Sequence, residues 1–160
     1  MLRAVAFNIL VLALLQIAPL AGVAHADSGL WLVTAEEAMR AKVPQGNVFE
    51  PVAAKVGPGP EIVVKTPRAL ERIQPPVDIL VTFEPGKSGL PPVMDTFKAT
   101  LIGFFDIDLT DRVREYIKGN QLDVKDAKLP NGNHRIRLTI RDTEDNANER
   151  DLTVKIVSGD

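Results

Sequence analysis

The C-terminal part of the chain alternates apolar and polar residues with a period of two. The apolar parity of this segment carries His134, Ile136, Leu138 and Ile140. The polar parity carries Arg135, Arg137, Thr139 and Arg141. A polar stretch at residues 142–148 follows, and then a second alternating run whose apolar parity is Leu152, Val154 and Ile156. Because successive side chains of a strand point to opposite faces, this pattern predicts an antiparallel hairpin with one buried and one solvated face.

Shorter apolar runs precede this hairpin and are separated by proline and glycine. They lie at residues 62–64, 77–82, 96–105 and 122–124. Residues 111–118 carry apolar residues at helical spacing and predict one or two helical turns, with Asp111 or Thr110 as the N-cap and Gly119-Asn120 at the end. The whole pattern, about seven short strands with frequent turns, predicts an all-β fold, an antiparallel β-sandwich.

The C-terminal stretch also resembles a known family. Residues 129–142 read Leu-Pro-Asn-Gly-Asn-His-Arg-Ile-Arg-Leu-Thr-Ile-Arg-Asp, and Asn146-Ala147-Asn148 and a last strand to Val157 follow. Here, and across residues 61–160, the chain resembles the bacterial secreted immunoglobulin-like domains of cadherin or fibronectin III type. The resemblance implies an immunoglobulin-like β-sandwich of about seven strands. Such domains serve as spacers, adhesion modules, sugar-binding accessories or assembly parts, and fold alone does not choose among these roles.

The N-terminus has the pattern of a secretory signal peptide. Arg3 precedes an apolar run at residues 4–20, and Ala24-His25-Ala26 supplies the small residues of a cleavage site. We expect a signal peptide at residues 1–26, with cleavage after Ala26. An uncleaved membrane anchor is the alternative, although polar residues interrupt the apolar run. The expected location is the periplasm or the extracellular space, without membrane insertion after cleavage.

Residues 27–60 differ in composition from the rest and predict a short helix followed by a linker. Thr34 and Glu37 form a capping-box pattern, and Pro44 limits the helix to about residue 43. Proline and glycine are frequent at residues 44–60 and predict an extended spacer before the domain at residues 61–160. Trp31 either docks a partner or packs back onto this domain.

Composition excludes several functions. The chain has no cysteine, 19 Lys and Arg against 21 Asp and Glu, and 5% aromatic residues. These counts exclude disulfides and thiolate chemistry, provide no basic surface for nucleic acid, and make large stacking platforms unexpected. After signal cleavage His134 is the one remaining histidine. We expect its ring to point inward and to bond a backbone group; a catalytic base is the alternative, but no nucleophile motif accompanies it.

Two groups of oxygen-bearing side chains are candidate calcium ligands. The first group is Asp106, Asp108 and Asp111. The second group is Asp142, Glu144, Asp145, Asn146, Asn148 and Glu149. Calcium requires six to eight oxygen ligands, and neither group forms an EF-hand loop. We expect helix-capping and turn chemistry at these positions, with calcium binding as the alternative.

The exposed arginines form a candidate binding stripe. Arg135, Arg137 and Arg141 share one strand face, and Lys155 lies on the neighbouring strand. An acidic partner such as an anionic polysaccharide would suit a free basic stripe. Cross-strand pairing with Asp or Glu is the interpretation that we favour, since such pairs stabilise an exposed sheet face.

These observations together predict a secreted or periplasmic, non-enzymatic immunoglobulin-like domain that acts as an interaction or spacer module in the cell envelope. The expected partner is an envelope protein and not a nucleic acid. We expect no cofactor, no metal and no catalytic residue. The alternative is a ligand-binding module for a polysaccharide or calcium.

Overall fold

The computed structural model of the protein describes residues 29–44, 51–68 and 71–158. The predicted signal peptide and its cleavage site lie outside the described residues. The described strands are β1 (Glu61–Thr66), β2 (Arg72–Ile73), β3 (Val77–Glu84), β4 (Pro92–Ile102), β5 (Ile107–Asp108), β6 (Ile117–Lys118), β7 (Gln121–Ala127), β8 (Gly132–Asp142) and β9 (Ala147–Ile156). The described helices are α1 (Ala35–Ala41), α2 (Thr110–Val113) and the 3₁₀ turn η1 (Arg114–Tyr116).

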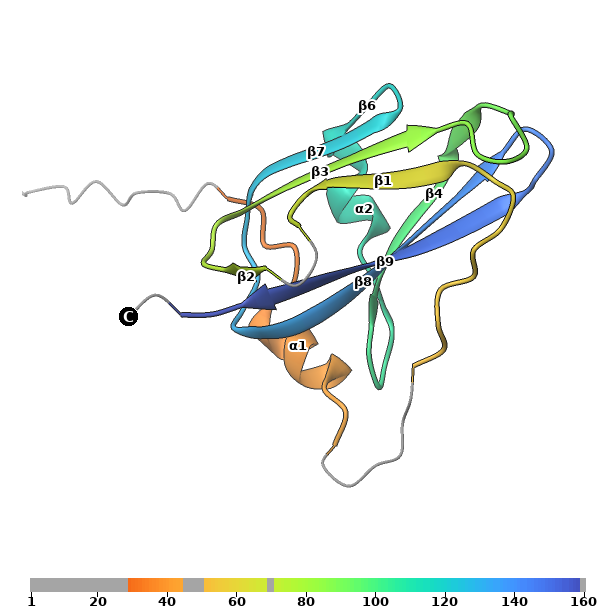
Figure 1. Ribbon diagram of the computed structural model, residues 1–160. Helices are drawn as coiled ribbons and strands as arrows, with labels where there is room; N and C mark the ends of the chain where they lie inside the picture. Colours follow the sequence, from red (N-terminus) through yellow and green to blue (C-terminus); the bar gives the residue numbers. More distant parts are fainter. Residues whose placement is uncertain (1–28, 45–50, 69–70, 159–160) are drawn as a thin grey trace, which may run out of the picture.

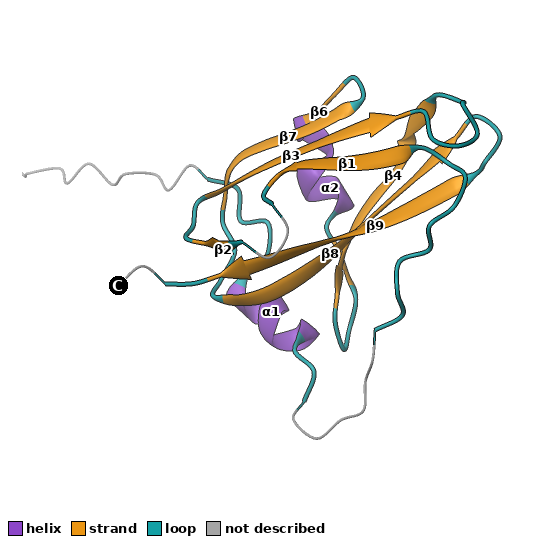
Figure 2. Ribbon diagram, viewed as in Figure 1, coloured by secondary structure: helices purple, strands orange, loops and turns teal. Residues whose placement is uncertain are grey.

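The strands form two sheets, which lie on opposite sides of one core (Figures 1 and 2). One sheet has the order β1-β3-β7-β6 and the other the order β2-β9-β8-β4-β5. All pairings are antiparallel except that of β2 with β9. The prediction of an all-β, mainly antiparallel fold is therefore confirmed. The described strands outnumber the predicted seven because β2, β5 and β6 have only two residues each, too few to show a period.

Alternating side chains from both sheets fill the core. In β8 the predicted inward residues His134, Ile136, Leu138 and Ile140 are at most 4% exposed. Phe83 of β3 meets Phe97 of β4 edge to face, with ring centroids 5.3 Å apart, so the two sheets touch through aromatic side chains. The period-two reading of the C-terminal hairpin is thus confirmed, although its turn is shorter than predicted and β9 already begins at Ala147.

The predicted helix at residues 111–118 is only partly present. Helical turns run from Thr110 to Tyr116, and the chain then enters β6. The expectation that Asp111 or Thr110 caps this helix is wrong, because Leu109 occupies the N-cap and makes no side-chain cap bond. Asp108 instead accepts a hydrogen bond from the Thr110 amide at 2.8 Å, and this contact forms the turn that leads into the helix.

The N-terminal arm, residues 29–43, is part of the domain. The capping box predicted from Thr34 and Glu37 is confirmed, with both reciprocal hydrogen bonds present at the start of α1. Backbone hydrogen bonds join the arm to Lys128: the Leu32 amide donates to the Lys128 carbonyl at 3.0 Å, and the Lys128 amide donates to the Leu30 carbonyl at 2.7 Å. These bonds hold the arm beside the end of β7 (Figure 1).

The arm inserts the two residues after Trp31 into the core. Leu32 is 2% exposed and Val33 is fully buried, whereas the Trp31 side chain remains 48% exposed. The arm packs onto the domain through the neighbours of Trp31, while the tryptophan itself stays half exposed, so its docking of a partner stays a prediction. The arm therefore adds apolar burial to the sandwich.

The strap, residues 51–60, is the described part of the predicted spacer. It is extended, as expected, but it lies along the start of β9 (Figure 1). Glu149 donates its amide to the Lys55 carbonyl at 3.0 Å, and the Gly57 amide donates to Asn148 Oδ1 at 3.1 Å. A Cβ at Gly57 would lie 1.9 Å from the Ala147 carbonyl oxygen, so this close approach requires glycine. The strap is therefore held against the sheet rather than free in solution.

Candidate functional site

One end of the domain combines an exposed aromatic turn with a cavity. The α1 helix and the turn between β4 and β5 meet there (Figure 1). The Phe104 amide donates a hydrogen bond to the Ala41 carbonyl at the end of α1, at 2.9 Å. A Cβ at Gly103 would lie 2.2 Å from the same carbonyl oxygen, so glycine permits this contact. The turn is fixed to the helix by these two features.

We call residues 103–106 the aromatic turn, because two phenylalanines occupy its tip. Phe104 is 38% exposed and Phe105 is 63% exposed. Their rings stack edge to face, with centroids 4.8 Å apart and an interplanar angle of 85°. Asp106 accepts a hydrogen bond from the Gly103 amide at 3.2 Å, which closes the turn. The Phe105 ring is thus presented to solvent by a backbone that is fixed on both sides.

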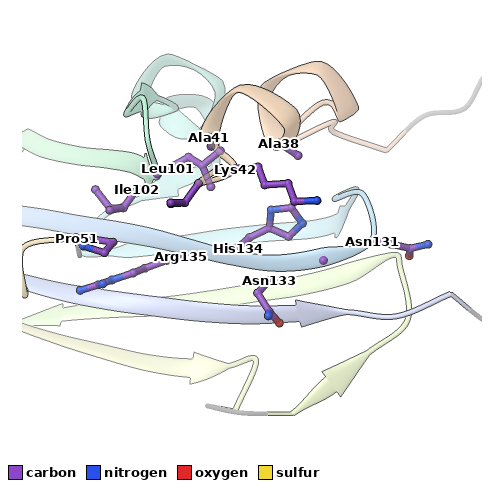
Figure 3. A pocket seen from close by; sticks show the side chains of 13 residues that line it. Ala38, Ala41, Lys42, Pro51, Leu101, Ile102, Asn131, Asn133, His134 and Arg135 are labelled. Atoms are coloured by element: carbon purple, nitrogen blue, oxygen red, sulfur yellow. The ribbon is translucent and has the colours of Figure 1, made fainter. Parts of the chain in front are cut away.

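A pocket of about 430 Å³ lies between α1 and the ends of β4 and β8 (Figure 3). We call it the α1 pocket. The arm contributes Ala38, Ala41, Lys42 and Val43 to its lining. The strap contributes Pro51, and β4 with the following turn contributes Leu101, Ile102 and Gly103. The start of β8 and the turn before it contribute Asn131, Gly132, Asn133, His134 and Arg135. The volume falls within the usual range of small-molecule sites.

The described lining of the α1 pocket contains cations and amides but no carboxylate. Arg135 is paired rather than free, because its guanidinium bonds Asp151, with Nε 2.7 Å from Oδ2, a carboxylate that Arg137 also binds. Lys42 is exposed and forms no ion pair with any described carboxylate. In Figure 3 the Lys42 side chain extends over the ring of His134. The pocket therefore has one uncompensated positive charge at its mouth.

His134 points inward and bonds a backbone group, as predicted. It is 4% exposed, and its Nε2 lies 2.6 Å from the Pro130 carbonyl oxygen. A carbonyl oxygen can only accept, so the proton of this hydrogen bond is on Nε2. The described lining around the ring offers no hydroxyl or carboxylate side chain. A catalytic triad would need both of these groups beside the histidine.

The three carboxylates of the first acidic group do not gather around one common point. Asp106 bonds the Gly103 amide, Asp108 bonds the Thr110 amide, and Asp111 is 97% exposed in its side chain, with Arg114 3.6 Å away. Hydrogen bonding to Thr110 lowers the pKa of Asp108. Each carboxylate thus has its own local partner.

Asp142 organises the second acidic group. It is 3% exposed, and its Oδ1 accepts the Glu144 amide at 2.9 Å and the Asn146 amide at 3.0 Å. Burial raises the pKa of Asp142, but hydrogen bonds from Ser88, Asn146 and Glu144 outweigh this effect and lower it to about 2. Here the carboxylate closes the β8–β9 turn. Within residues 29–44, 51–68 and 71–158, no three His, Asp or Glu side chains gather as metal ligands.

The arginine stripe is a paired sheet face, as we favoured. Arg137 lies opposite Asp151 in the β8–β9 register, and its Nε is 2.8 Å from Asp151 Oδ1. The Asp151 carboxylate also binds Arg135, and Arg141 pairs with Asp145 at 3.0 Å. Burial raises the pKa of Asp151, whereas hydrogen bonds from Arg137 and Arg135 lower it, and the net shift is downward. Lys155 is exposed at the far end of β9, opposite Asn133.

A salt bridge that the sequence did not predict fastens the arm. Arg112 of α2 binds the Glu37 carboxylate through both Nη atoms, and its Nη1 also donates to the Leu32 carbonyl at 3.0 Å. This hydrogen bonding from Arg112, together with that from Thr34, lowers the pKa of Glu37 from 4.5 to about 2. The same carboxylate therefore caps α1 and ties it to the sandwich.

No protein-family model, curated protein or solved structure matches the chain. Among the described helices, none has the length and apolar character needed to cross a bilayer. The site must therefore be interpreted from its own geometry and chemistry.

Proposed function

We propose that the protein is a non-enzymatic, immunoglobulin-like interaction module of the cell envelope. The strand order supports the immunoglobulin-like assignment. Sheet β1-β3-β7-β6 has the sequence-order pattern of strands A, B, E and D, and β9, β8 and β4 follow the pattern of G, F and C. In this scheme β2 and β5 are short additional strands at the two edges of the second sheet.

The observation that carries the interaction role is the aromatic turn. Partner-binding surfaces concentrate their binding energy in a few aromatic anchors on well-fixed backbone. Phe105 is 63% exposed and stacks on Phe104, whose amide is fixed to Ala41. Met39, 69% exposed on α1, adds a further apolar side chain to the surface of the arm. Leaving such side chains in water is unfavourable, and a partner that covers them would gain by burial.

The envelope location in this proposal rests on the signal-peptide pattern at residues 1–26. The non-enzymatic role rests on the chemistry of the chain, which has no cysteine and, after cleavage, only His134 as an imidazole base. The expected partner is an envelope protein that presents an apolar surface to the aromatic turn.

The proposal is tested by capture of the partner in its native envelope. A C-terminally tagged protein is crosslinked there, and the retained proteins are identified. We expect one stoichiometric partner for the wild type and about tenfold less of it for Phe105→Ala, since removing an aromatic anchor typically costs more than 1 kcal/mol of binding. The matched control is Val56→Ala, which removes an 81% exposed side chain of the strap. Equal retention by both variants would contradict the role of the aromatic turn.

A further inference from the structure

The α1 pocket has the composition of a site for an amphipathic anion. One wall is apolar, formed by Ala38 and Ala41 of α1 and by Leu101 and Ile102 of β4. The polar part of the lining is formed by residues 131–135, before and within β8, the strand that pairs with β4 in the same sheet. Small-molecule sites typically combine a mainly apolar lining with a few polar groups that fix the ligand orientation.

The charges of the pocket limit the charge of its ligand. Asp151 binds Arg135 and Arg137 together, and no described carboxylate pairs with Lys42. One free ammonium group therefore faces the ligand, and a single negative charge matches it.

The polar groups of the lining point to a carboxylate as that charge. Lys42 offers an ammonium donor at the mouth of the pocket, beside the ring of His134. A phosphate or sulfate would favour a free arginine fork, and the Arg135 fork is occupied by Asp151 and the Val52 carbonyl. The described lining has no Phe, Tyr or Trp ring on which a sugar could stack. We infer that the α1 pocket binds a small monocarboxylate with an apolar body, its carboxylate at Lys42 and its body against α1 and β4.

This ligand site goes beyond the proposed protein contact and uses different side chains. Phe104 and Phe105 do not line the pocket. If the wild-type protein captured no partner but bound the carboxylate, this result would therefore count against the proposed function alone. If it captured a partner but bound no carboxylate, the result would count against the ligand site alone.

The test is a titration of the purified, isotopically labelled protein with hexanoate, followed by amide chemical shifts. We expect saturable shifts at Gly103 and Gly132, which belong to two different segments of the lining, with a dissociation constant on the order of 1 mM for a ligand of this size. Hexanol, the neutral analogue, and hexylamine, the cationic one, are titrated in parallel. We expect each of them to bind at least about fivefold more weakly than hexanoate.

Two variants separate charge from shape. Lys42→Gln removes the exposed ammonium group and is expected to weaken hexanoate binding about fivefold, whereas Lys87→Gln, an exposed lysine in the β3–β4 loop, is the matched control and is expected to leave it unchanged. Ala38→Leu fills the apolar wall and is expected to abolish saturation while Lys42 is retained. Unchanged affinity in Lys42→Gln, equal binding of hexanol, or absence of shifts at Gly103 and Gly132 would each overturn the inference.

Discussion

Replacing Leu32 with alanine is expected to lower the free energy of unfolding by about 3 kcal/mol, the usual cost of a buried leucine-to-alanine change. Leu32 is 2% exposed and packs in the same core region as Leu109, Val113 and Leu138. The neighbouring backbone is held by Lys128, so the arm cannot easily move to fill the cavity. Urea unfolding of the wild type and the variant measures the difference.

The control for this change is Met39→Ala on the same arm. The Met39 side chain is 69% exposed, so we expect its removal to change the free energy of unfolding by no more than about 0.5 kcal/mol. If Leu32→Ala and Met39→Ala had equally small effects, the arm would not be part of the core in solution. The sandwich would then be the independent domain at residues 61–160 that the sequence predicts.

Acid is expected to weaken the attachment of the arm through Glu37. The folded-state pKa of Glu37 is about 2, below its ordinary value of 4.5, because Arg112 and Thr34 donate hydrogen bonds to the carboxylate. A lowered pKa means that the stabilisation is present above about pH 4.5 and is lost as the pH falls toward 2. After allowance for solvent screening, the loss is about 2 kcal/mol.

Glu37→Gln isolates this contribution. The variant is expected to be less stable than the wild type at pH 6 and to lose about 2 kcal/mol less than the wild type between pH 6 and pH 2.5. Glu36→Gln is the matched control, since the carboxylate of Glu36 pairs with Arg40 on the exposed side of α1. Parallel acid-unfolding curves for the wild type and Glu37→Gln would contradict a stabilising Glu37–Arg112 pair.

Local sequence patterns were sufficient for the elements that repeat with a fixed period or carry a cap. The alternation in β8 and β9 predicted both strands and their buried faces, and Thr34 with Glu37 predicted the start of α1. The two-residue strands have no period to detect. The sequence run at residues 96–105 predicted a strand through Phe105, whereas β4 ends at Ile102. The two phenylalanines there read as strand residues, although the Phe104-Phe105-Asp106 sequence breaks the alternation.

Features that depend on distant contacts could not be read from the sequence. Leu32 and Val33 looked like neighbours of a docking tryptophan, because nothing local to the arm indicates its contact with Lys128. The sequence predicts a spacer at the strap because its proline and glycine content is the only local signal. The bonds of the strap to Asn148 and Glu149 connect residues about ninety positions apart, so no local pattern indicates them. The α1 pocket is formed by the arm, β4 and β8 together, so it exists only once the fold has formed.

The most direct test of the interaction role is photo-crosslinking from the aromatic turn in living cells. A photoreactive phenylalanine analogue is placed at position 105 and, as the matched control, at position 56 of the strap, both highly exposed. We expect one discrete protein adduct from position 105 and no such adduct from position 56. Absence of an adduct at position 105, or the same adducts from both positions, would contradict the assignment of this end of the domain as the partner-binding surface.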